Sequence, residues 1–151
     1  MQVDFYQLSR DPAEVAVAQI AAKALPAGQR MLVVAGDEAL LGRIGGALWG
    51  RVRDGFLPNG MAGGEHDARQ PILLARELPL DEAGKGAPNG AGVVAFADGV
   101  WRECGGFARA LLFFDEGGVV PARRLWKTLG ERGDVVRAFW KQEDGRWVKA
   151  A

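Results

Sequence analysis

The residues best suited to chemistry lie near the end of the chain, where cations and aromatic rings alternate. Between positions 121 and 141 there are six Lys and Arg residues against two acids, although the whole chain balances 19 basic with 19 acidic residues. A predicted helix over about 119–131 carries three of these cations, Arg123, Arg124 and Lys127, together with the aromatic residue Trp126. Cations beside aromatic rings suit an acidic ligand with an apolar part. The pattern predicts binding rather than catalysis.

The chain offers no complete set of catalytic or metal-ligating residues. Ser9 is its only serine, His66 its only histidine and Cys104 its only cysteine. A Ser-His-Asp triad or a Cys-His pair would need these isolated residues to converge, and a zinc site needs three or four ligands. We therefore expect no metal and no cofactor.

A nucleotide site is also disfavoured by the turns that follow the predicted strands. The turn after 30–35 reads Ala-Gly-Asp-Glu, with one glycine and two acids where a phosphate cradle needs several glycines. Gly42, Gly45 and Gly46 lie inside a helical pattern and are predicted to allow close helix packing. The alternative is a small Rossmann-like enzyme or nucleotide-binding protein that uses carboxylates placed after strands. Its candidate residues are Asp98, Asp115 and Glu116, each of which also suits a cap or turn.

Composition places the chain among ordinary single-domain proteins. With 151 residues, 48% of them hydrophobic, the chain is long enough for one core, and we expect a single domain over 1–151. Its neutral balance argues against general nucleic-acid binding. The start lacks the basic and apolar pattern of a signal peptide, and no apolar run reaches the ~20 residues of a membrane span. We expect a soluble protein in the cytoplasm, with no direct nucleic-acid or membrane partner.

Strand and helix patterns alternate along the chain and predict an α/β fold with parallel crossovers. Strands are predicted at 3–8, 30–35, 72–75, 92–96 and 108–115. A helix follows each of the first two, with Asp11 and Asp37 as N-caps and Pro12 in the first turn. A short helix is predicted at 101–105, and residues 50–70 are predicted to be irregular. The strands 135–142 and 146–148 are expected to form a closing hairpin, with Glu143-Asp144-Gly145 as the turn.

Several segments in order resemble the chi subunit family of bacterial DNA polymerase III. They are Phe5-Tyr6-Gln7-Leu8, Ala47-Leu48-Trp49, Phe56-Leu57-Pro58, Ala122-Arg123-x-x-Trp126-Lys127 and Trp140-x-x-x-Asp144-Gly145-Arg146-Trp147. The similarity extends over essentially the whole chain. Two departures are that relatives usually carry histidine where Asn59 stands, and that the 116–118 tip is short and poor in cations.

The resemblance implies a three-layer Rossmann-like fold with a mostly parallel sheet, helices on both faces and no working nucleotide site. Chi subunits are non-catalytic clamp-loader accessory proteins. They bind the acidic, Phe-terminated tail of single-stranded DNA-binding protein and also the psi subunit, which ties chi to the clamp loader. In some relatives a helicase competes for the psi surface.

For the tail, the resemblance points to the predicted basic helix. Arg123 and Lys127, four residues apart, share one helix face, and Trp126 lies on the same side. The guanidinium fork of Arg123 matches a terminal carboxylate, while Trp126 and Val120 would wall a slot for the Phe ring. Arg124 and Arg132 would attract the acids of the tail. The alternative is that Trp126 packs inward and the cations form an ordinary solvated face.

For psi, the matching residues are Trp49, Phe56, Leu57 and Pro58. Exposed aromatic anchors of this kind carry much of an interface's binding energy. The alternative is that Trp49 and Phe56 cover the edge of the core. Trp140 and Trp147 are predicted to belong to a sheet edge rather than to a binding site.

Overall fold

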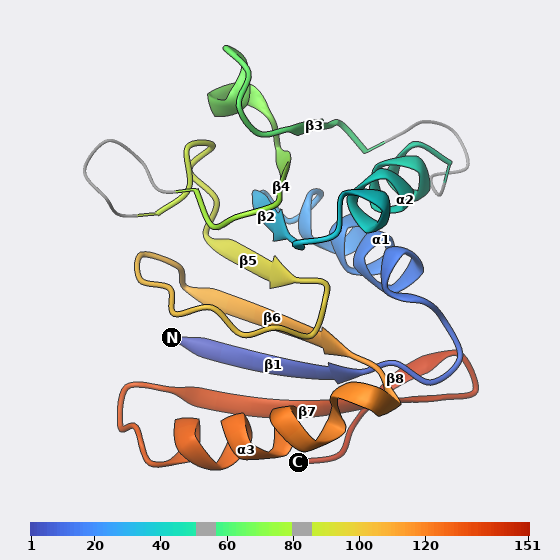
Figure 1. Ribbon diagram of the computed structural model, residues 1–151, viewed down its shortest axis with the longest axis vertical. Coiled ribbons are helices and arrows are strands. Elements are labelled where there is room, and N and C mark those ends of the chain that lie inside the picture. The colour runs from blue at the N-terminus through green and yellow to red at the C-terminus, as the bar shows by residue number, and fades with distance from the viewer. Residues whose placement is uncertain (51–56, 80–85) are drawn as a thin grey trace.

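The computed structural model describes residues 1–50, 57–79 and 86–151, which form an α/β fold around one sheet (Figure 1). The helices are α1 (Ala13–Ala24), α2 (Glu38–Gly50) and α3 (Val119–Gly130), with short 3-10 turns at Asp67–Arg69 and Glu116–Gly118. The strands are β1 (Gln2–Gln7), β2 (Met31–Val34), β3 (Asn59–Met61), β4 (Ile72–Ala75), β5 (Val93–Phe96), β6 (Arg109–Phe114), β7 (Val136–Glu143) and β8 (Arg146–Lys149).

In the described residues the strands form one eight-stranded sheet, ordered β3-β4-β2-β5-β6-β1-β7-β8. Every described pair is parallel except β7–β8. The predicted α/β class and mostly parallel sheet are confirmed. The sequence pattern did not show that β1 lies between β6 and β7, separated from β2 by β5 and β6. Hydrophobic periodicity indicates that a segment is a strand but not which strands pair with it.

Helices cover both faces of the sheet, as the three-layer prediction requires. Met31 and Val33 of β2 face α1 and α2, whose Val17 and Ile44 are fully buried against that side. Leu32 and Val34 of β2 lie on the other face of the sheet, in the same buried cluster as Leu129 of α3. Because alternate residues of β2, β4, β5 and β6 are buried on opposite faces, these strands have the nearly continuous apolar composition of a doubly covered parallel sheet.

Two local predictions about helices are wrong. Asp11 does not cap α1: Pro12 is the N-cap residue, and Asp11 instead accepts a 3.0 Å hydrogen bond from Gln142 Nε2 of β7. No helix forms at 101–105, because the Asp98 carboxylate takes the Val100 N–H and organises this segment as an extended loop. Asp37 does cap α2, accepting a 2.9 Å bond from the Ala39 N–H.

The glycines of α2 and the 50–70 region also differ in part from prediction. At Gly45 an added Cβ would lie 3.6 Å from Asn59 Oδ1 and Leu74 Cδ1, which is ordinary van der Waals contact, so Gly45 packs toward the sheet without an approach that requires glycine. At Gly42 and Gly46 it would meet nothing within 4 Å, so close packing is wrong for these two. The short strand β3 went unpredicted, because its Asn-Gly-Met sequence has no strand composition.

The closing hairpin is confirmed, with β7 and β8 paired antiparallel from Glu143↔Arg146 to Trp140↔Lys149. Its turn places Asp144 at φ 51° and Gly145 at φ 75°, as a two-residue turn with a left-handed backbone requires.

A buried carboxylate lies at the centre of the sheet. Asp4 of β1 is 0% exposed and forms an ion pair with Arg109 of β6. It also accepts a 3.0 Å hydrogen bond from Trp140 Nε1 of β7, while Arg109 Nη2 donates to the Tyr6 hydroxyl at 2.9 Å. One carboxylate therefore ties together three adjacent strands that come from both ends of the chain.

We expect Asp4→Asn to lower the free energy of unfolding by about 2–3 kcal/mol, because the mutation leaves the Arg109 guanidinium without its anion in a mostly buried site. Urea denaturation followed by far-UV circular dichroism measures the change. The matched control is Glu131→Gln, which removes an exposed charge and should change stability by less than about 0.5 kcal/mol. Equal effects of the two variants would contradict a structural role for Asp4.

Candidate protein-binding surfaces

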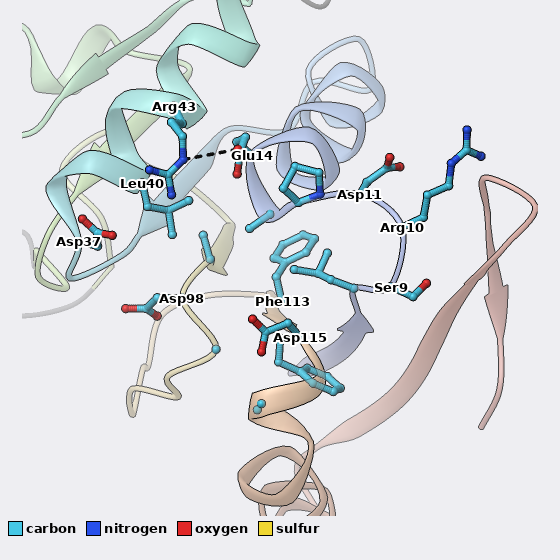
Figure 2. Close-up of a pocket in the computed structure, with 18 residues that line it drawn as sticks. Ser9, Arg10, Asp11, Glu14, Asp37, Leu40, Arg43, Asp98, Phe113 and Asp115 are labelled. Atoms are coloured by element: carbon cyan, nitrogen blue, oxygen red, sulfur yellow. Dashed lines mark ion pairs between the residues drawn. The ribbon is translucent and has the colours of Figure 1, made fainter.

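A crevice opens at the carboxyl ends of the parallel strands, where ligands of doubly wound folds usually bind. It has a volume of about 740 Å³ and lies between the turns that follow β1, β2, β5 and β6. Five carboxylates line it, and Figure 2 shows them around the cavity: Asp11, Glu14, Asp37, Asp98 and Asp115. Of its two arginines, Arg43 is paired with Glu14 at 3.4 Å. This acidic rim opposes binding of a phosphate group.

Of the carboxylates proposed for enzymatic use, Asp98 has structural partners. Asp98 forms a bidentate pair with Arg102, at 2.8 and 2.9 Å, and accepts the Gly36 N–H at 2.9 Å. Burial raises the pKa of the Cys104 thiol to about 11, which disfavours the thiolate that a nucleophile needs. His66 is exposed and contacts Glu65 at 3.4 Å. Within the described ranges, no group of three or more His, Cys, Asp or Glu side chains could hold a metal ion.

Asp98 joins the loop after β5 to the turn after β2. Burial alone would raise the pKa of its carboxyl, but this effect is outweighed by hydrogen bonds from Arg102, Gly36 and Val100 and by the Arg102 charge. The pKa of Asp98 therefore lies below its ordinary value. Stability linked to this group is complete above the unfolded pKa of about 3.9 and is lost as pH falls through the lower folded value.

We expect Asp98→Asn to lower the free energy of unfolding by about 1–2 kcal/mol at pH 7, where the wild-type carboxylate is charged and hydrogen-bonded. The gap between wild type and variant should narrow as pH is lowered below about 4, because protons then bind the Asp98 carboxyl of the unfolded wild-type chain before that of the folded protein. Urea titrations of both proteins at pH 7 and pH 3 measure the difference in their free energies of unfolding. A gap that stays constant with pH would contradict the assigned pKa direction.

The cations of α3 lie on its exposed side, and its apolar residues face the sheet. Ala122 and Leu129 are buried and Leu125 and Trp126 half-buried, at the spacing of one helix face. The opposite side carries four exposed residues that we call the α3 stripe: Val120, Arg123, Arg124 and Lys127. Their spacing of three and four residues makes them neighbours. Among the described residues, none of the three stripe cations forms an ion pair.

Trp126 lies beside the stripe and its ring packs on the sheet. The ring contacts Phe5 at 5.3 Å and Phe139 at 5.7 Å, both edge-to-face. The guanidinium of Arg137 lies 4.2 Å from the ring centroid, and its Nη1 donates to the Trp126 carbonyl at 2.5 Å. Trp126 is therefore fixed in place while part of it remains exposed next to Arg123.

Arg137 joins α3 to β7 and was not identified from the sequence. A Cβ added at Gly130 would lie 2.5 Å from Arg137 Cζ, so the end of α3 needs glycine for this guanidinium to cross it. The only sequence signal was one more arginine in a cation-rich segment. Arg132, proposed to attract acids, already pairs with Asp134 at 3.2 Å and Glu103 at 3.6 Å.

The residues proposed for psi lie at the other edge of the sheet, around α2 and β3. Trp49 is 57% exposed and Pro58 is exposed, but Leu57 is buried in the core, where its N–H donates to Leu48 O. Asn59 donates from Nδ2 to Leu57 O at 2.9 Å, which shapes the entry to β3. Phe56 lies outside the described residues. Met61 is 49% exposed on this edge strand and was missed, because a single Met in a Gly-rich segment carries no distinguishing pattern.

These features define a Rossmann-like α/β protein whose switch-point crevice is acidic and whose cations lie on an outer helix. The family model described as DNA polymerase III chi subunit, HolC, matches residues 1–137 of the 151. The chain therefore belongs to the chi subunit family, a family of DNA polymerase III accessory subunits. A comparison with curated proteins finds no match for this chain. Within the described residues, no helix is long and apolar enough to cross a membrane.

Proposed function

We propose that this protein is a non-catalytic, cytoplasmic adaptor of the replication machinery, built as a single domain over residues 1–151. It captures the acidic C-terminal tail of single-stranded DNA-binding protein and links it, through the psi subunit or an equivalent clamp-loader component, to the polymerase. The observation that carries the proposal is the α3 stripe, whose three cations have no acidic partner among the described residues and lie beside a half-exposed Trp126.

The stripe matches the chemistry of an acidic tail that ends in Phe. Arg123 presents a guanidinium that can pair with the terminal carboxylate through two hydrogen bonds. Val120, 58% exposed one turn earlier, and the exposed part of Trp126 offer apolar contact to the ring. Arg124 and Lys127 add positive charge for the tail's aspartates. Because the Trp126 ring is held by Phe5, Phe139 and Arg137, it is positioned before the ligand arrives.

We expect a labelled acidic peptide ending in Pro-Phe to bind with micromolar affinity, and Arg123→Ala to weaken binding at least about tenfold, because charge-assisted hydrogen bonds contribute about 1.5–3 kcal/mol. Binding should also weaken with added salt, which screens exposed charges. Fluorescence anisotropy measures both effects.

The peptide with an amidated C-terminus tests the carboxylate contact directly and should lose affinity to the same extent as Arg123→Ala. The matched protein control is Arg69→Ala, which removes an exposed arginine at the far end of the molecule from α3 (Figure 1). Unchanged binding for both the amidated peptide and Arg123→Ala would refute tail capture at this helix.

For psi, we propose the surface formed by Trp49, Pro58 and Met61, together with Phe56. Trp49 of α2, Pro58, and Met61 of the edge strand β3 have exposed apolar side chains and lie on a different part of the sheet from α3. The buried Leu57 supports this surface from below. The helicase that competes for psi in some relatives would use the same surface.

We expect Trp49→Ala to weaken binding of the psi subunit about 30-fold, the effect of removing an aromatic hot spot worth about 2 kcal/mol. Isothermal titration calorimetry measures it. Arg123→Ala is the cross-control, because it should impair tail binding and leave psi binding intact. The opposite pattern would show that the two surfaces have been assigned the wrong way round.

A further inference from the structure

A small cavity lies under the closing hairpin, on the α1 side of the sheet and opposite to α3. It has a volume of about 290 Å³ and is lined mainly by Tyr6, Ile20, Lys23, Arg109, Trp140 and Trp147. Trp140 and Trp147 lie beyond residue 137, where the chi family match ends. The cavity shares no lining residue with either surface described above, and we call it the tryptophan cavity.

The aromatic walls of the tryptophan cavity are rigidly placed. Trp140 stacks beside Tyr6 at 6.2 Å and 11°, and its indole N–H is held by the buried Asp4 carboxylate. Trp147 meets Tyr6 edge-on, at 5.0 Å and 81°. Ile20 of α1 supplies an apolar contact. These walls suit a ring or another compact apolar group.

The charged groups that line the cavity are cationic. Lys23 lies exposed in the last turn of α1. Arg109 donates hydrogen bonds from Nε to the Asp4 carboxylate and from Nη2 to the Tyr6 hydroxyl, while its Nη1 has no partner among the described residues. Among the described residues no carboxylate lines the cavity, and the nearby Asp4 is fully buried and bonded to Arg109 and Trp140. The cavity therefore favours a ligand with a negative group.

Trp147 has an unmet hydrogen-bonding need. Its indole Nε1 is shielded from solvent and has no acceptor in the described residues. A buried donor without an acceptor is unfavourable and rare in folded proteins, so this N–H calls for a partner that the chain itself does not supply among its described residues. A ligand oxygen seated against the Trp147 ring would supply the acceptor.

We propose that the tryptophan cavity binds a small anion consisting of one planar ring and one carboxylate or phosphate. The ring packs among Trp140, Trp147 and Ile20, and the negative group lies near Lys23 and Arg109. At about 290 Å³ the cavity accommodates one such group and excludes a long peptide. The site is independent of tail capture, because it lies on the other face of the sheet from the α3 stripe.

The test uses nuclear magnetic resonance of the ¹⁵N-labelled full chain, following the indole N–H signals of its five tryptophans. The probes are indole-3-acetate and phenyl phosphate, which distinguish a carboxylate from a phosphate ligand. We expect one of them to shift the Trp147 signal saturably, and to bind up to about fivefold more tightly than its neutral analogue, indole-3-acetamide or phenol, because a partly exposed ion pair contributes up to about 1 kcal/mol. Acetate alone, which lacks the ring, should bind more weakly still.

Two variants and one control locate the site. Lys23→Met should reduce affinity for the anionic probe about fivefold and leave the neutral analogue unaffected. Trp147→Phe keeps a ring in the hairpin but removes the N–H, and should weaken binding of the same probe. The control is Lys141→Met, since Lys141 is exposed on the other face of the same hairpin and should not matter.

The proposal is overturned if neither anionic probe shifts the Trp147 signal at millimolar concentration. It is also overturned if acid and neutral analogue bind equally, or if the shifts appear at Trp126, on the α3 side. A folded Lys23→Met variant that binds like wild type would exclude the assigned position of the negative group. Failure here leaves tail capture untouched, because the peptide titration reports on a different face.

Discussion

The buried carboxylate of Asp4 is the interaction on which the arrangement of this sheet depends. A charge with no solvent exposure must be paired, and Asp4 finds its partners in Arg109 of β6 and Trp140 of β7. These partners place β1 between two strands that are distant in sequence from it. An apolar residue at this position would pack adequately in several strand orders, whereas a carboxylate is satisfied only where a cation and an indole N–H meet it.

The position of β7 next to β1 determines in turn how α3 sits. Phe139 and Arg137 project from β7 toward α3 and hold the Trp126 ring between them and Phe5. With its apolar face held in this way, α3 exposes Val120, Arg123, Arg124 and Lys127 together. The contact between Asp4 and Trp140 on the α1 side of the sheet positions β7, and β7 in turn holds α3 on the other side. The stripe that we propose as the tail receptor therefore depends indirectly on that contact.

Charge is distributed unevenly over a chain that is neutral as a whole. Carboxylates gather at the carboxyl ends of the strands, where an α/β fold would ordinarily bind phosphate, and three cations without an ion pair among the described residues lie together on the outer side of α3. Asp98 illustrates the change of role, because its carboxylate holds Arg102 and the Gly36 amide rather than a substrate. The crevice therefore opposes a nucleotide, and α3 attracts an acidic partner.

Much of the fold was predictable from local patterns, and part of the site was too. Continuous apolar runs marked the buried strands, Asp37 marked the start of α2, and Asp144-Gly145 marked the hairpin turn, because each depends on residues close in sequence. The spacing of Arg123, Arg124 and Lys127 showed their common helix face for the same reason. Predictions failed where a side chain forms a hydrogen bond that the pattern did not indicate. Asp11 accepts a hydrogen bond from Gln142 instead of capping α1, and Asp98 accepts one from the Val100 N–H next to the segment predicted as a short helix.

The sequence by itself determined the type of each main element, the amphipathic character of α3 and the family to which the chain belongs. Only the tertiary structure decided which strands are neighbours, that Arg137 crosses Gly130 to hold Trp126, that Leu57 is buried, and that Trp140 and Trp147 enclose a cavity. The physical reason is the range of the interactions. Helix faces and turns follow from residues a few positions apart, whereas a buried ion pair joins residues 105 positions apart, and no local pattern records that pairing.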